Sequence, residues 1–181
     1  MTEFYDALET RPPEEREAAH MAALARQVAH AQQHASAFAH ILQGVDASRI
    51  TSREALAALP VTRKSELHER QHVARAAGAG AFGGFATQGW GARMPRVFAS
   101  PGPIYEPEGT ARDYWRMARA LFAAGFRQGE LVHNCFSYHF VPAGSMMETA
   151  AHALGCTVFP GGTGQTEQQV QAMADLRPAG Y

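Results

Sequence analysis

The residues best able to bind a metal or act as nucleophiles are the nine histidines and two cysteines of this 181-residue chain. His30 and His34 stand four residues apart on an expected helix, as do His68 and His72. That spacing can place two metal ligands on one helical face. No third ligand is evident for either pair, so we interpret both pairs as surface histidines and predict no metal site.

Cys135 and His139 have the side chains of a thiol nucleophile and its base. Residues four apart on a strand rarely meet in the geometry that such chemistry needs. Cys135 lies in the apolar run 131–136 and Cys156 in the run 156–159, so we expect two buried free thiols. Unpaired cysteines are typical of a reducing compartment, and we expect a cytoplasmic protein.

A glycine-rich turn, Pro160–Gly164, follows an apolar segment that we expect to be a strand. Ligands of α/β proteins bind beyond the carboxyl ends of parallel strands. The turn therefore has two interpretations. It either faces a substrate cleft or is a plain connection from strand to helix, and the residues themselves favour the plain connection.

The elements that would position these residues begin with helices. Two prolines and two glutamates at 12–15 indicate a helix start. Apolar residues then recur at steps of three and four as far as Leu42, and Gly44 is expected to end the pattern. Two shorter helices are predicted, one over residues 52–59 and one that starts at Thr62 as N-cap.

Composition and pattern divide the chain into three regions. Residues 1–75 form a helical arm, and residues 76–95 are a glycine-rich loop that we expect to be mobile, with its aromatic side chains as anchors. Residues 96–181 form the third region. A further strand is expected to begin where the sequence stops, at Tyr181, so we expect this region to be truncated.

The third region alternates between apolar segments and helical patterns. Strands are expected at 96–100, 131–137 and 156–159, with a helix after each. Thr110-x-x-Asp113 and Thr166-x-x-Gln169 have the spacing of capping boxes. Two successive strand–helix–strand units favour a parallel sheet. The predicted fold class is α/β, with an N-terminal helical arm followed by the start of a parallel-sheet βαβ subdomain.

The charge balance argues against two classes of partner. Sixteen basic and seventeen acidic residues give a net charge of -1, without a block of like charges. We therefore expect no nucleic acid and no membrane surface as partners. No apolar stretch approaches the length that spans a bilayer.

The segment 154–170 carries a family resemblance. Its residues Leu154-Gly155-Cys156-Thr157-Val158, Pro160-Gly161-Gly162 and Thr166-Glu167-x-Gln169-Val170 resemble the phenylacetate-CoA ligase family of AMP-forming enzymes. Residues 58–67 resemble the same family, and the similarity covers nearly the whole chain apart from the glycine-rich loop. The resemblance implies activation of an aryl or arylacetic acid with ATP and Mg²⁺ as an acyl-adenylate, and then transfer to CoA.

The resemblance also implies that parts of the enzyme lie elsewhere. Members of the family are much longer, and their motifs for adenine, ribose and the catalytic lysine have no counterpart here. We therefore expect no catalytic residue in this chain and no turnover by the chain alone. A complementing C-terminal chain or a homodimer are the protein partners to consider.

The family has a Ser/Thr/Gly-rich loop that ends in Lys-Pro and surrounds the ATP phosphates. The matching stretch here is 100–107, where Ser100, Gly102 and Pro107 fit the pattern. Pro101 and Pro103 lack an N–H, and Glu106 has the wrong charge for a phosphate. Either the loop has lost its phosphate contacts, or it still binds ATP through Ser100, Gly102 and Mg²⁺.

The resemblance assigns the acyl pocket to Phe136, Tyr138, Phe140 and Gly144. Aromatic walls suit a flat apolar acid, and a glycine leaves room for its ring. A helix from about Pro142 would direct its N-terminus at the carboxylate. The alternative is that the two phenylalanines are core residues. A competing function is a non-catalytic binding or assembly module with a degenerate phosphate loop.

Overall fold

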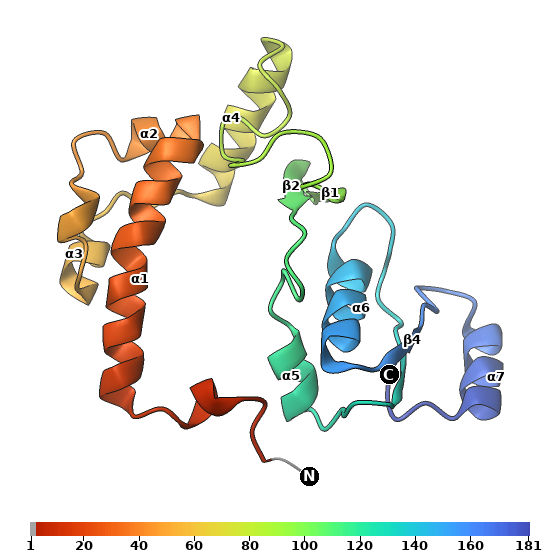
Figure 1. Ribbon diagram of the computed structural model, residues 1–181. Helices are drawn as coiled ribbons and strands as arrows, with labels where there is room; N and C mark the ends of the chain where they lie inside the picture. Colours follow the sequence, from red (N-terminus) through yellow and green to blue (C-terminus); the bar gives the residue numbers. More distant parts are fainter. Residues whose placement is uncertain (1–2) are drawn as a thin grey trace. The chain divides into compact units, whose positions relative to one another are not determined.

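The computed structural model describes residues 3–181, which form two compact units. The helical unit comprises Asp6–Met94 and Gly102–Pro107. The α/β unit comprises residues 3–5, Pro95–Pro101 and Glu108–Tyr181. In Figure 1 the helical unit runs from red to yellow and the α/β unit is mainly green to blue. Within residues 3–181 no helix is long and apolar enough to cross a membrane.

The helical unit is built from four helices and two short 3-10 turns. They are α1 (Pro13–His34), α2 (Ser36–Ile41), α3 (Arg53–Ala57) and α4 (Lys64–Ala76), with turns at Ala7–Thr10 and Ala47–Arg49. The core of this unit contains Val28, Leu42 and Ile50, which bring α1, α2 and the second turn together. The single helix expected as far as Leu42 is therefore wrong, because the extended backbone of Ala35 separates α1 from α2.

Two helix starts in this unit can be compared with the sequence. The helix expected over 52–59 is present as α3, and the Ser52 hydroxyl caps it by accepting the N–H of Ala55 at 3.1 Å. Thr62 does not cap α4. That helix begins at Lys64 after Arg63, whose N–H donates to the Glu66 carboxylate at 3.3 Å. The charged side chain thus completes the first turn without the predicted hydroxyl.

The glycine-rich segment packs against the helices of the same unit. The Ala37 N–H donates to the Gly84 carbonyl at 3.1 Å, and the Phe85 ring lies edge-on to Phe38 with centroids 5.4 Å apart. A side chain at Gly83, where φ is +59°, would lie 2.9 Å from the α4 backbone. Glycine is therefore needed for this close approach, and an aromatic side chain anchors the segment as the sequence suggested.

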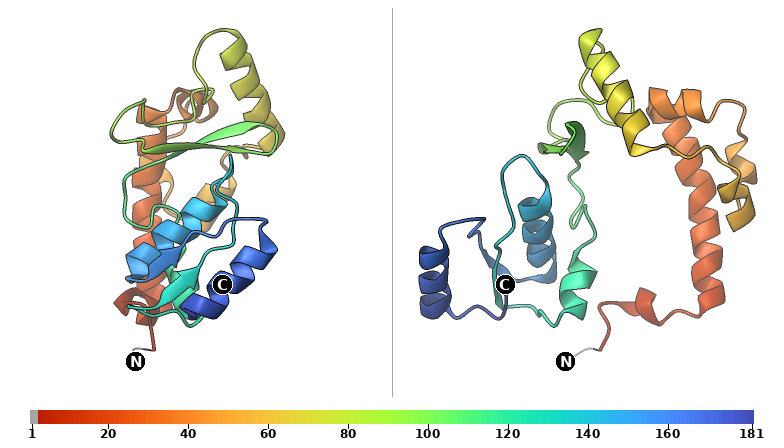
Figure 2. Two further views of the ribbon diagram at one scale, coloured as in Figure 1. Left: turned by 90° about the vertical axis from the view of Figure 1, so that its right-hand side faces the viewer. Right: turned by 180° about the vertical axis from the view of Figure 1, so that it is seen from behind.

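The α/β unit contains two parallel strands between helices. Its elements are β1 (Arg96–Ser100), α5 (Ala118–Ala123), β3 (Leu131–His133), α6 (Ala143–Leu154), β4 (Thr157–Phe159) and α7 (Thr166–Leu176). β3 and β4 are paired in parallel, with Val132 opposite Val158. A parallel bridge joins Val132 to Gly180. Figures 1 and 2 show α6 on one side of the strands and α7 on the other, so the predicted β–α–β unit is confirmed.

The first strand does not join this parallel sheet. The parallel sheet contains β3 and β4 only, and β1 is followed after a short turn by β2 (Ile104–Glu108). The expectation that residues 96–100 begin the βαβ series is therefore wrong, although they are a strand. Residues 101–103 form a turn that contains two prolines and a glycine, which reverses the chain before a helix can start.

Neither predicted capping box is present. α5 begins at Ala118, and the Asp113 carboxylate accepts the N–H groups of Met117 and Ala118 at 2.9 to 3.2 Å. α7 begins after Gln165, and the Gln169 side chain binds carbonyl groups of the preceding turn. Asp113 and Gln169 thus form hydrogen bonds other than those that the two predicted capping boxes require.

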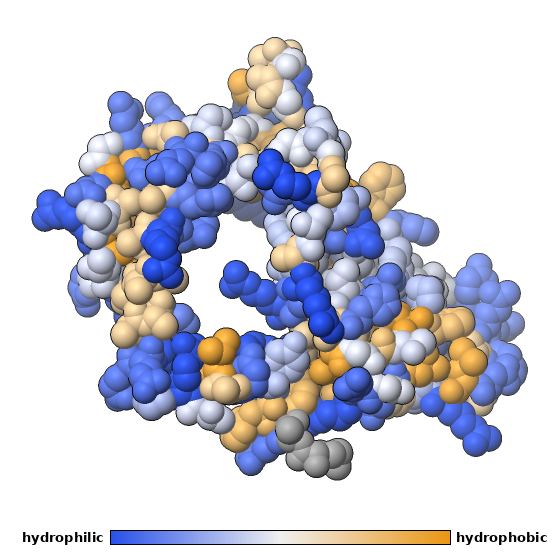
Figure 3. Space-filling model, in the orientation of Figure 1, coloured by the Kyte–Doolittle hydropathy of each residue, from blue (hydrophilic) through white to orange (hydrophobic). Residues whose placement is uncertain are grey.

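The core of the α/β unit lies between the strands and the α5–α6 pair. It consists of Ala118, Leu121, Val132, Ala150, Ala151 and Cys156. Cys156 and Cys135 are both free thiols, but Cys135 is only partly buried, so its predicted full burial is wrong. On the face drawn in Figure 3, apolar side chains gather between α6 and α7.

Candidate functional site

Asn134 connects the segments that meet beyond the carboxyl end of β3. Its amide nitrogen donates to the Tyr138 hydroxyl at 2.7 Å and to the Gly144 carbonyl at 2.8 Å. Its backbone N–H donates to Phe159, and its carbonyl accepts the N–H of Gly162. Asn134 is only 3% exposed. Asn134 thus links the loop after β3 and the start of α6 through its side chain, and the turn after β4 through its backbone. A buried, fully paired residue of this kind restrains the segments that it joins.

Tyr138 is held at both ends. Its hydroxyl donates to the Glu148 carboxylate at 2.6 Å and accepts from Asn134. Its ring lies so close to Gly144 that a Cβ there would approach it to 2.7 Å. Burial, and next the hydrogen bond to Glu148, raise the pKa of the Tyr138 phenol well above its usual value. The phenol therefore stays protonated and serves as a hydrogen-bond donor.

A buried carboxylate, that of Glu108, lies beside the start of α6. Glu108 is 2% exposed and accepts from Arg96 at 2.5 Å, from the Trp115 indole at 2.9 Å and from the Ser145 hydroxyl at 3.2 Å. Ser145 belongs to the first turn of α6. Since three donors converge on one carboxylate, β1 and the first turn of α6 are tied to the same group.

Phe140 has an unusual backbone in the loop between β3 and α6. Its φ is +62°, and the Val141 N–H donates to the His139 carbonyl at 2.7 Å, which closes a three-residue γ-turn around Phe140. Its own carbonyl accepts the N–H of Ala99 from β1 at 2.8 Å. A bulky residue with positive φ is strained, and such strain concentrates at functional positions. The residue is 83% exposed, so burial does not explain the strain.

The four predicted acyl-pocket residues have different environments. Phe136 is about half exposed and Phe140 is exposed, so the alternative that they are core residues is wrong. Phe136 lines a hollow of about 230 Å³ beside β3 with Leu121, Ala124, Phe126, Val132, His133, Asn134, Cys135, Met147 and Tyr181. The space left by Gly144 is filled by the ring of Tyr138.

The two predicted phosphate contacts fall into different units. Ser100 ends β1 in the α/β unit, and Gly102 belongs to the helical unit. In the helical unit, the buried Gln71 side chain of α4 pairs with both backbone groups of Tyr105, at 2.8 and 2.9 Å. That N–H is therefore occupied, and two prolines offer none. Within 100–107, the Tyr105 N–H is therefore not available to a phosphate.

α4 also carries the second histidine pair, in the order His68-Glu69-Arg70-Gln71-His72. These letters match the His-Glu-x-x-His pattern of zinc peptidases, which needs a third ligand. Among residues 3–181 no group of three His, Cys, Asp or Glu side chains could hold a metal ion. Gln71, between the histidines, faces the 102–107 segment instead.

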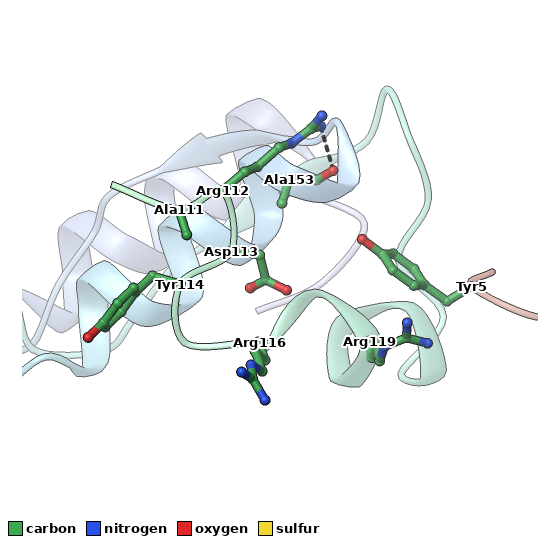
Figure 4. A pocket seen from close by; sticks show the side chains of 8 residues that line it. All are labelled: Tyr5, Ala111, Arg112, Asp113, Tyr114, Arg116, Arg119 and Ala153. Atoms are coloured by element: carbon green, nitrogen blue, oxygen red, sulfur yellow. Dashed lines mark hydrogen bonds between the residues drawn. The ribbon is translucent and has the colours of Figure 1, made fainter. Parts of the chain in front are cut away.

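The largest hollow described in the α/β unit, about 640 Å³, lies beside α5. Figure 4 shows arginines around it, with the Asp113 carboxylate directed toward its centre. Arg112 donates to the Ala153 carbonyl at 2.7 Å, and the Arg119 guanidinium lies 4.9 Å from the ring centroid of Tyr5. These side chains hold the chain start and the end of α6 in place, so the hollow is a weaker candidate than the edge around Asn134.

Sequence reasoning did not identify Asn134, Glu148 or Gln71. A signal existed for the first two. Asn134 directly follows a strand at the ligand-binding edge of a parallel sheet, and Glu148 is the only acid in α6. Together with Tyr138 they form one hydrogen-bonded network, which contains no nucleophile and base pair.

Comparisons with known proteins find relatives that share one name, phenylacetate-coenzyme A ligase. No family model matches the chain. The phenylacetate-coenzyme A ligase of Thermus thermophilus is 33% identical over 186 aligned positions, which cover 97% of this chain and 39% of the relative. The phenylacetate-coenzyme A ligase of Aromatoleum evansii is 32% identical over 143 positions, which cover 75% of this chain and 30% of the relative. The chain thus spans less than two fifths of either relative.

Solved structures share the fold. The crystal structure of a 2-hydroxyisobutyryl-CoA ligase in the postadenylation state, in complex with 2-HIB-AMP, matches with a TM-score of 0.81 at 25% identity. The match covers 93% of this chain and 36% of that chain. The same ligase with 2-HIB-AMP and CoA, in the thioesterification state, matches with a TM-score of 0.81 at 24% identity. The α/β fold with its helical arm is therefore the one found in this ligase.

Proposed function

Because the chain belongs to the phenylacetate-CoA ligase family, we propose that its α/β unit binds the carboxylic acid of an ATP-dependent, AMP-forming acyl-CoA ligase. The proposed substrates are aryl or arylacetic acids. In the complete reaction the acid becomes an acyl-adenylate, and CoA then forms the thioester. The proposed place of action is the cytoplasm.

The observation that carries the proposal is the edge beyond β3 and β4. There Tyr138 donates to Glu148 and accepts from Asn134, and Phe140 has a left-handed backbone and is exposed to solvent. In this proposal Phe136 and Phe140 contact the acyl group, and Tyr138 with Gly144 forms the fixed wall behind them. These residues bind and orient the acid, and they move no proton.

Nucleotide contacts come from outside this segment in the proposal. ATP supplies the leaving group for activation of the acid. We propose that the stretch 100–107 does not bind its phosphates, because the Tyr105 N–H is paired with Gln71 and Pro101 and Pro103 have no N–H. A complementing polypeptide with the lysine-bearing part of the ligase is therefore the proposed partner. CoA and Mg²⁺ enter with that partner, and the chain alone has no turnover.

Calorimetry on residues 1–181 tests the acid site. We expect phenylacetate to bind and ATP with Mg²⁺ not to bind, and a Phe140→Ala variant to lose affinity for phenylacetate. A panel with benzoate and 2-hydroxyisobutyrate defines the preferred acid. Thioester formation from acid, ATP and CoA by this chain alone would contradict the need for a partner, and no binding of any acid would end the proposal.

A second function is favoured by one observation. The amide pair between Gln71 and Tyr105 removes a phosphate donor from the loop, which suits a non-catalytic binding or assembly module. Addition of the part of the Thermus thermophilus ligase that lies beyond the 39% covered by this chain distinguishes the two functions. Restored adenylate formation supports the ligase, whereas acid binding without restored activity supports the module.

A further inference from the structure

The orientation of the Gln169 side chain is fixed by its hydrogen bonds. Its amide nitrogen donates to the carbonyl of Gly162 at 3.0 Å and to the carbonyl of Gly164 at 2.5 Å. Both amide hydrogens are therefore in use. The remaining atom, Oε1, lies 3.0 Å from Nε2 of His133, the last residue of β3.

This geometry assigns the tautomer of His133. Gln169 Oε1 can only accept, so the hydrogen of the imidazole must be on Nε2. Nδ1 is then an acceptor, and it is buried without a hydrogen-bond partner. His133 is 1% exposed. A hydrogen on Nδ1 would have no acceptor there, and a buried donor without a partner is costly.

The same contact explains the glycine at the start of the turn. A Cβ at Gly161 would lie 2.7 Å from His133 Nε2 and 3.0 Å from Gln169 Oε1. Any side chain at this position therefore separates the pair. The two glycines at 161–162 and the glutamine seven residues after Gly162 thus form one structural unit.

We propose that Gln169 is a positioning residue, which holds the Pro160–Gly164 turn against β3 through His133 in the Nε2–H tautomer and thereby sets the acid site. The path is continuous, because the Gly162 N–H donates to the Asn134 carbonyl at 3.0 Å, and Asn134 also binds Tyr138. The effect on acid affinity rests on the proposed function. The tautomer and the coupling to Asn134 do not.

Nuclear magnetic resonance of the full chain tests the tautomer directly. A long-range ¹H–¹⁵N spectrum of the histidine rings is expected to show His133 with its hydrogen on Nε2. In Gln169→Leu the single tautomer is lost, and the resonances of Asn134 and Tyr138 shift. Gln168→Leu, on the exposed side of the same helix, is the matched control and leaves all three unchanged.

Gly161→Ala provides a second variant, which separates the pair without removing either side chain. We expect the same shifts, and a loss of acid affinity between about 2-fold and about 30-fold in both variants. A hydrogen on Nδ1 in the unmodified chain overturns the inference, as do shifts in Gln169→Leu that do not reach Asn134 and Tyr138. If no acid binds to the unmodified chain, the proposed function fails, and the two spectroscopic results still decide this inference.

Discussion

The strained backbone of Phe140 predicts which of two substitutions at this position gives the more stable protein. The left-handed region costs a residue with a side chain about 1–2 kcal/mol of conformational free energy, and Phe140 lies there with a φ of +62°. Glycine has no such penalty, but it makes the unfolded chain more flexible, which costs about 0.5–1 kcal/mol. The exposed ring contributes little burial, since 83% of the residue is in contact with solvent.

The perturbation is therefore a pair of substitutions, Phe140→Gly and Phe140→Ala. Alanine keeps the strain, whereas glycine removes it, so Phe140→Gly is expected to be the more stable by up to about 1.5 kcal/mol. For a chain of this length, each kcal/mol corresponds to about 2–4 °C in Tm. Both variants lack the aromatic ring, and both are expected to bind phenylacetate more weakly.

Urea and thermal unfolding, monitored by circular dichroism, measure which of the two Phe140 variants is the more stable. Gln168, exposed within α7, is the control position, where the alanine variant should be more stable than the glycine variant by about 1 kcal/mol. If Phe140→Ala is as stable as Phe140→Gly, the loop is not strained in solution, and the argument that strain marks this residue as functional is refuted.

Three further substitutions test the polar contacts. Tyr138→Phe is expected to lower the free energy of unfolding by about 1–3 kcal/mol. Because the folded-state pKa of the Tyr138 phenol is raised, the native chain should lose stability as pH rises above about 10. Urea titrations at pH 8 and pH 11 should show a smaller loss of stability in the variant than in the native chain. Gln71→Leu leaves two backbone groups of Tyr105 unpaired and should cost about 2–5 kcal/mol, with faster amide exchange at Tyr105, whereas equal exchange would refute the pairing. Glu108→Gln should shift the fluorescence of Trp115, which donates to that carboxylate, and an unchanged spectrum would contradict the contact.

Local patterns in the sequence predicted three consecutive elements of the α/β unit. The apolar runs predicted β3 and β4, and the pattern between them predicted α6, which ends at Gly155 with a φ of +89°. These patterns involve residues within one or two helical turns of each other, so they can be recognised from the sequence without knowing the rest of the fold. The turn at Pro160–Gly164 was located in the same way.

The site itself was decided by tertiary structure. Asn134, Tyr138 and Glu148 meet because a loop returns to the start of α6, and Gln71 meets Tyr105 across 34 positions of the chain. Polar partners so far apart leave no periodic signal, because a single side chain makes each contact. Local sequence patterns therefore predicted α6, β3 and β4. The packing of distant segments decided where α1 ends and α2 begins, and which polar groups face each other.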